Sequence, residues 1–213
     1  MDAPDYDEPQ LNIPKHILYW RRCLKTYLPH LYTGYDSSRM TLAFFILSAL
    51  DLLGELDASL SPAARKGHIE WVYSCQLPEG GFRAFPGADL GPSRNNENRV
   101  WDPASVPATF FALLCLALLG DDLQRVKRRE ILEWLRRMQR EDGSFGDFLG
   151  EYGRIEGGKD TRFGYMSTGI RWILRGNTQG PVDGIADINV DSFVECVRKA
   201  EVDVRSHFCS PMS

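Results

Sequence analysis

The residues most often used as metal ligands and nucleophiles are few in this sequence and lie far apart. The 213 residues include four histidines and five cysteines, namely His16, His30, His68, His207, Cys23, Cys75, Cys115, Cys196 and Cys209. No Cys-x-x-Cys pair occurs, and the histidines lack the spacing of a metal site. His207 and Cys209 lie close together but offer only two ligands, so we assign no metal ligand and no catalytic residue to this chain.

Composition excludes several classes of protein. Lys and Arg total 25 and Asp and Glu total 29, a net charge of −4 that argues against a nucleic acid partner. No apolar run reaches the roughly 18 residues that a membrane span requires. The first seven residues are acidic and contain no apolar signal segment. We therefore expect a cytoplasmic protein with reduced cysteines.

A repeat of about 60 residues organises the chain. Residues 69–82 align with residues 132–145 at a shift of 63 positions, and both read Glu-Trp, a spacer, Gln and an acidic-Gly-small-Phe turn. Residues 43–54 return at 109–120 with a shift of 66 positions, and both segments end in Leu-Leu-Gly. The two blocks differ in character, so each unit is predicted to contain two different helices.

The two predicted helices of a unit have distinct surfaces. Residues 38–53 and 104–119 are apolar on nearly all sides, as buried helices are, and the glycine that follows each supplies a left-handed C-cap. Residues 62–76 and 125–140 are amphipathic. We predict an inner layer of the first kind and an outer layer of the second. Alternating β-branched residues are missing, so the predicted fold class is all-α.

Such helix pairs can stack into an open superhelix or into a ring around a cavity. Common open helical repeats contain about 34 to 47 residues, so the longer unit found here favours a ring. A third unit begins with an inner helix at 164–176 and an outer helix from 190, but residues 204–207 do not form the expected turn. The predicted parts are a flexible N-terminus at 1–12, a partial ring at 13–200 and an atypical tail at 201–213.

Several motifs together resemble the β subunits of the protein prenyltransferases, above all those of the type I geranylgeranyltransferases. The most specific is Ser38-Arg39-x-Thr41-x-Ala43-Phe44-Phe45. The others are Arg22-Cys23-Leu24, Gly120-Asp121-Asp122-Leu123, Gln139-x-Glu141-Asp142-Gly143-Ser144-Phe145 and Asp160-x-Arg162-Phe163-x-Tyr165. The resemblance covers about residues 13–200 and corresponds to the N-terminal half of a full family member.

This resemblance implies an α-α toroid whose cavity holds geranylgeranyl diphosphate beside the Cys-a-a-X terminus of a protein substrate such as a small GTPase. It also implies an α subunit that wraps around the ring and a zinc ion that binds the substrate thiolate. A free thiol with a pKa of about 8.5 is mostly protonated at neutral pH, so coordination to zinc is needed to make the substrate cysteine a thiolate nucleophile. The transferred lipid gives the product affinity for membranes.

The resemblance also assigns substrate-binding roles. Thr41 stands where farnesyl-transferring relatives carry Trp and would deepen the pocket for a longer isoprenoid. Phe45 and Tyr165 would form aromatic walls against the lipid. The competing structural interpretations are a Thr41 hydroxyl bonded to the preceding helical turn and a Phe45 ring packed in the core.

Three further residues would contact the peptide tail. Arg162 would lie near the isoprenoid and the peptide carboxylate, which a guanidinium group suits, although it could instead bond a helix end or Asp160. Phe163 would shape the pocket for the last residue of the tail. Ser105 replaces the histidine of the family's aromatic-Asp-x-x-His segment. The basic residues of 125–140 are expected to form a solvated outer helix surface, with contact to an α subunit as the alternative.

The family's zinc ligands and diphosphate-binding residues lie in its C-terminal half, and nothing in this sequence substitutes for them. We therefore expect a truncated chain of the geranylgeranyltransferase type I β lineage that shows no turnover with an α subunit and zinc. One alternative is a non-catalytic scaffold that binds a partner through exposed inner helices. Another is a terpene cyclase fragment, although an acidic D-x-D-D motif is missing.

Overall fold

The computed structural model describes residues 11–26 and 28–208, with the backbone alone at residue 33 and over 202–208. Its α-helices are α1 (Ile13–Lys25), α2 (Arg39–Leu52), α3 (Leu56–Ser59), α4 (Pro62–Ser74), α5 (Val106–Leu118), α6 (Arg128–Arg137), α7 (Thr161–Arg175) and α8 (Val190–Phe208). Short 3₁₀ helices cover His30–Ser38, Pro86–Ala88, Gly91–Ser93, Arg99–Trp101 and Glu151–Gly153. The helical architecture confirms the predicted fold class.

One antiparallel strand pair, β1 (Phe148–Leu149) and β2 (Ile155–Glu156), was not predicted. Its register pairs Phe148 with Glu156 and Leu149 with Ile155. Strands of two residues are too short to show the alternation by which a strand is recognised in a sequence. The pair closes the loop between α6 and α7 and leaves the layers of helices unchanged.

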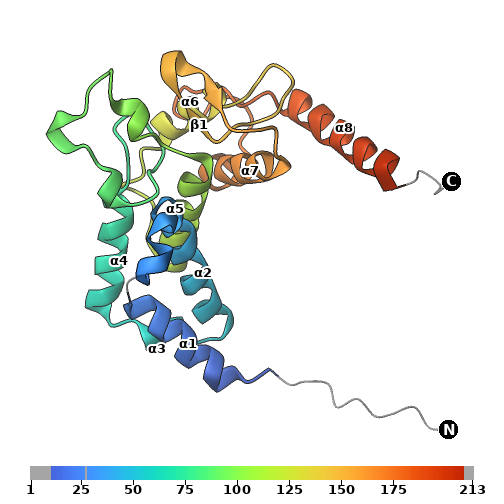
Figure 1. The fold of residues 1–213 in the computed structure, drawn as a ribbon. Coiled ribbons are helices and arrows are strands. Elements are labelled where there is room, and N and C mark those ends of the chain that lie inside the picture. The colour runs from blue at the N-terminus through green and yellow to red at the C-terminus, as the bar shows by residue number, and fades with distance from the viewer. Residues whose placement is uncertain (1–10, 27, 209–213) are drawn as a thin grey trace, which may run out of the picture.

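The inner layer consists of α2, α5 and α7, with α5 in the middle (Figure 1). Helix α1 packs on α2, while α4 packs on α5 and α6 packs on α7. Each of these two outer helices therefore packs on the inner helix of the following repeat, which links successive units. Helix α8 extends away from the layers (Figure 1).

Local capping explains where the helices begin and end. The Ser61 and Ser105 hydroxyls accept hydrogen bonds from the backbone N–H groups three residues later, each at 3.2 Å, at the starts of α4 and α5. Gly54 and Gly120 follow α2 and α5 with φ angles of 69° and 74°. Both adopt the left-handed conformation predicted for a C-cap glycine.

The repeated Gln and Gly-containing turn position the next outer helix. The Gln76 side chain accepts from the backbone N–H of Lys127 at 2.8 Å, and Gln139 does the same for Asn189 at 2.8 Å. A Cβ atom at Gly143 would lie 2.1 Å from the carbonyl oxygen of Ser192, so only glycine allows α8 to approach this turn. The Gln and the glycine-containing turn that repeat in the sequence therefore connect one unit to the next.

The inner helices are not buried equally. Helix α5 buries side chains on nearly all its sides, as predicted. The same prediction is wrong for α2, in which only Met40, Leu47 and Leu50 are buried while Leu52 is 84% exposed. The reason is that α5 has inner helices on both sides, whereas α2 contacts only one.

Two expectations concern the ends of the chain, namely a missing repeat turn at 204–207 and a flexible N-terminus at 1–12. Helix α8 continues to Phe208, across the positions 204–207 where the repeat would place its turn. The side chain of Asn12 accepts from the N–H of Lys15 and caps α1, while residues 1–10 and 209–213 lie outside the described residues. None of the described helices combines the length and apolarity needed to cross a bilayer.

Candidate functional site

A continuous row of aromatic rings crosses the three inner helices. Phe45 of α2 lies 5.9 Å from Phe111 of α5 between ring centroids. Phe111 lies 5.4 Å from Phe110, and Phe110 meets Tyr165 of α7 edge to face at 5.5 Å. These spacings are those of attractive aromatic pairs. We call these four residues the aromatic row.

The two ends of the aromatic row are open while its middle is packed. Phe45 is 51% exposed and Tyr165 is 66% exposed, whereas Phe110 and Phe111 are 6% and 8% exposed. The row thus combines a buried centre with two large apolar surfaces that are exposed to water. Covering such a surface with an apolar ligand is favourable by about 25 cal/mol for each Å² removed from water.

Helix α7 can join the row because of a glycine. A Cβ atom at Gly169 would lie 2.4 Å from Cε2 of Phe110, so a larger residue there would force the Phe110 ring to move. Gly169 follows Tyr165 by four residues and shares its face of the helix. Glycine at this position lets the Phe110 ring lie against the helix and reach Tyr165.

Thr41 and Ser105 lie on a second feature, a cavity of about 440 Å³ between the N-terminal ends of α2 and α5. Asp147 and Trp101 also line it. The Thr41 hydroxyl forms no hydrogen bond to the preceding helical turn within the described part of the chain, unlike Thr168, whose hydroxyl donates to the carbonyl of Gly164 at 2.9 Å. Ser105 serves as the N-cap of α5.

Arg162 and Phe163 are not among the described residues that line this cavity. Arg162 is exposed and pairs with Asp160, with 2.6 Å between Nη2 and Oδ2, at the N-terminus of α7. The Arg162 hydrogen bonds lower the pKa of Asp160 to about 2. Phe163 is half-buried and packs against the core. The structure therefore shows for Arg162 the pairing that was its competing interpretation.

Comparison with known proteins identifies the family. The model of the prenyltransferase alpha-alpha toroid domain matches residues 11–210. The chain belongs to this family. The solved structure of Candida albicans protein geranylgeranyltransferase-I complexed with GGPP has the same fold, with a TM-score of 0.74 and 23% identity, over 89% of this chain and 51% of that chain.

Curated relatives of this prenyltransferase-family chain are β subunits. It is 30% identical to the geranylgeranyl transferase type-1 subunit beta of Dictyostelium discoideum, over 88% of this chain and 54% of the relative. The Arabidopsis thaliana protein of the same name is 29% identical over 80% of this chain and 46% of the relative. The farnesyltransferase subunit beta of Schizosaccharomyces pombe is 30% identical over 65% and 32%. The chain spans about half the length of the geranylgeranyl transferase relatives.

The prenyltransferase family raises the question of zinc, which the described residues do not fit. Within the described part of the chain, no three His, Cys, Asp or Glu side chains converge to form a metal site. His207 lies where only the backbone is described, and Cys209 is outside the described residues. Burial raises the pKa of the Cys115 thiol to about 12, so this thiol stays protonated and is not poised to bind a metal.

Three residues of the site were missed in the sequence. Phe110 and Phe111 could have been found, because they repeat Phe44 and Phe45 of the preceding unit. Asp147 carried no signal. Its Oδ1 atom is buried without a hydrogen-bond partner among the described residues, and burial raises the pKa of this carboxyl group. A ligand in this cavity that donates a hydrogen bond to Asp147 would therefore satisfy a buried oxygen that has no partner among the described residues.

Proposed function

We propose that this chain forms the isoprenoid-binding wall of a protein prenyltransferase β subunit of the geranylgeranyl-transferring type. The observation that supports the proposal most strongly is the aromatic row, with Phe45 and Tyr165 exposed at its ends. The lipid chain would lie along the row, and its contact with the rings would remove both partners from water. The buried rings of Phe110 and Phe111 would keep the exposed rings of Phe45 and Tyr165 in place against the lipid.

The preference for a geranylgeranyl chain rests on Thr41. Relatives of both the geranylgeranyl and the farnesyl class are about 30% identical to this chain, so overall identity does not separate the two. Thr41 is small and lines the cavity of about 440 Å³. A tryptophan at position 41 would fill part of this cavity, whereas threonine leaves room for a longer isoprenoid.

The rest of the proposed assembly follows from the family. An α subunit would complete a cytoplasmic heterodimer, and the acceptor would be a protein ending in Cys-a-a-X. Ser105 and Asp147 would meet the tail in the cavity that they share. Zinc, when bound in such an enzyme, would stabilise the thiolate of the acceptor cysteine, which is the nucleophile. Because the described residues do not offer a zinc site, we assign this chain lipid and peptide contacts and no catalytic step.

Titration of the purified chain with geranylgeranyl diphosphate tests the proposal. We expect saturable binding of one lipid per chain, measured by isothermal titration calorimetry, and weaker binding of farnesyl diphosphate by at least about tenfold. Inorganic diphosphate serves as the control and should not compete, because the aromatic row binds the lipid chain. Competition by inorganic diphosphate, or no lipid binding, would contradict the proposal.

A non-catalytic scaffold is the second candidate, favoured by one observation. Besides Phe45 and Tyr165, Trp172 of α7 is 56% exposed. Exposed aromatic residues of this kind are common where proteins bind one another. Capture of a prenyltransferase α subunit without any binding of geranylgeranyl diphosphate would favour the scaffold over the lipid-binding wall.

A further inference from the structure

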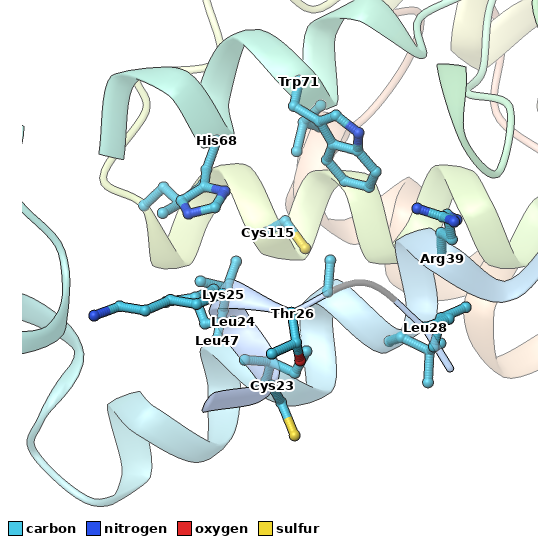
Figure 2. Close-up of a pocket in the computed structure, with 15 residues that line it drawn as sticks. Cys23, Leu24, Lys25, Thr26, Leu28, Arg39, Leu47, His68, Trp71 and Cys115 are labelled. Carbon is cyan, nitrogen blue, oxygen red and sulfur yellow. The ribbon is translucent and has the colours of Figure 1, made fainter. Parts of the chain in front are cut away.

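A separate apolar cavity lies between α1 and α2 on one side and α4 and α5 on the other (Figure 2). Its volume is about 450 Å³, within the range of about 300 to 1,000 Å³ that small-molecule sites occupy. Leu42, Ala43 and Ile46 of α2 form much of its wall. None of the six predicted substrate-binding residues is among the described residues that line it.

Two polar rings of α4 face this apolar wall. His68 and Trp71 are three residues apart, so they lie on the same side of the helix, and Figure 2 shows both rings directed into the cavity. Within the described part of the chain, neither the His68 ring nor Nε1 of Trp71 has a hydrogen-bond partner. Burial lowers the pKa of His68, so its ring is uncharged at neutral pH. The cavity therefore offers one N–H donor and one neutral imidazole.

Two cationic side chains, Lys25 and Arg39, belong to the cavity lining. Lys25 lines the rim, but its ammonium group points away from the space (Figure 2). Arg39 is already paired, with 2.7 Å between its Nε and Oδ1 of Asp36, and its guanidinium carbon lies 5.8 Å from the centre of the Phe85 ring. An anionic ligand would thus lose its hydration and meet mainly the Arg39 guanidinium, whose charge Asp36 already offsets.

We propose that this cavity binds an uncharged apolar molecule with a single hydroxyl or carbonyl group. Its oxygen meets the His68 ring and Nε1 of Trp71, and its hydrocarbon part lies against the α2 wall. At about 30 Å³ for each atom, the volume that a water molecule takes in the liquid, the cavity has room for roughly fifteen non-hydrogen atoms. A primary alcohol with a chain of about ten carbons has about eleven non-hydrogen atoms, so it fits within this volume, and it has the polarity of this lining.

The first experiment compares 1-decanol with decanoate at pH 8 by isothermal titration calorimetry. The two probes share a chain length and differ in charge. We expect decanol to bind at one site per chain and decanoate to bind at least about tenfold more weakly. Equal affinity for the two probes would overturn the proposal, as would the absence of decanol binding.

Variants then locate the bound alcohol. Ala43→Leu fills the cavity and should weaken decanol binding at least about tenfold, whereas Ala63→Leu at an exposed position of α4 should leave it unchanged. Trp71→Phe keeps an aromatic ring, although a smaller one, and removes the donor, so a fall in affinity of about fivefold is expected for one lost hydrogen bond. Circular dichroism establishes that each variant is folded, and Trp71→Phe retains the test if Ala43→Leu is not.

The variants also distinguish this cavity from the aromatic row. A loss of decanol affinity in Phe45→Ala but not in Ala43→Leu or Trp71→Phe would place the alcohol on the row and refute the proposal. Unchanged affinity in both Ala43→Leu and Trp71→Phe would refute it as well. Because none of these measurements uses an isoprenoid diphosphate, failure here leaves the proposed function untouched.

Discussion

Replacing Phe45 by alanine removes one open end of the aromatic row. A phenylalanine offers about 200 Å² of surface when free, and Phe45 keeps 51% of its surface exposed. A lipid that covers the remainder would remove about 100 Å² from water, which is worth about 2.5 kcal/mol at 25 cal/mol/Å². Since about 1.4 kcal/mol corresponds to a factor of ten in affinity, full coverage predicts a loss of up to roughly sixtyfold. Incomplete coverage still predicts about tenfold.

Calorimetric titration with geranylgeranyl diphosphate measures this loss in Phe45→Ala. Leu52→Ala is the matched control, because Leu52 is also a large exposed apolar residue of α2 and lies outside the row. We expect no change in lipid affinity for the control. Both variants should stay folded, since half or more of each side chain is exposed. A loss below about threefold in Phe45→Ala, or an equal loss in Leu52→Ala, would refute the assignment of the row as the lipid wall.

Three further predictions test other parts of the molecule. Thr41→Trp should lower the affinity for geranylgeranyl diphosphate relative to farnesyl diphosphate by at least about tenfold; an unchanged ratio in the same titration would contradict the role of Thr41. Asp102→Asn should destabilise the fold by about 3 kcal/mol in urea unfolding, because it breaks a buried pair with Arg83 (2.7 Å); Asp57→Asn is the control and should change little, because the Asp57 side chain is 97% exposed. Because burial lowers the pKa of His68, the unfolded chain binds more protons below about pH 6.5 and stability should fall on acidification; His68→Leu should show a smaller fall between pH 7 and pH 5, and identical pH profiles would contradict this reasoning.

The helices and their ends could be predicted from the sequence because their causes are local. The Ser61 and Ser105 caps and the glycines after α2 and α5 act within one turn of the chain. The apolar face of α6 was also visible in the spacing, and Ile131, Trp134 and Leu135 are buried as expected. Such signals identify a helix and its buried side without reference to any other element.

The sequence could not show which helices meet. Outer helix α4 packs on α5 rather than on α2, the inner helix that precedes it in its own unit, and this choice places His68 and Trp71 over the cavity beside α1. It could not show either that Arg162 pairs with Asp160 or that the Oδ1 atom of Asp147 is buried without a hydrogen-bond partner among the described residues. These facts depend on distances between groups that are set by packing.

By itself, the sequence determined that this protein is built from repeated pairs of one apolar and one amphipathic helix, with two adjacent phenylalanines in each of two inner helices. Only the tertiary structure decided that phenylalanines of both helices form one row with Tyr165 and that the two ends of this row are exposed. The physical reason is that exposure belongs to the packed assembly. The same apolar helix is buried when it has inner neighbours on both sides, as α5 has, and partly open when it has one, as α2 has.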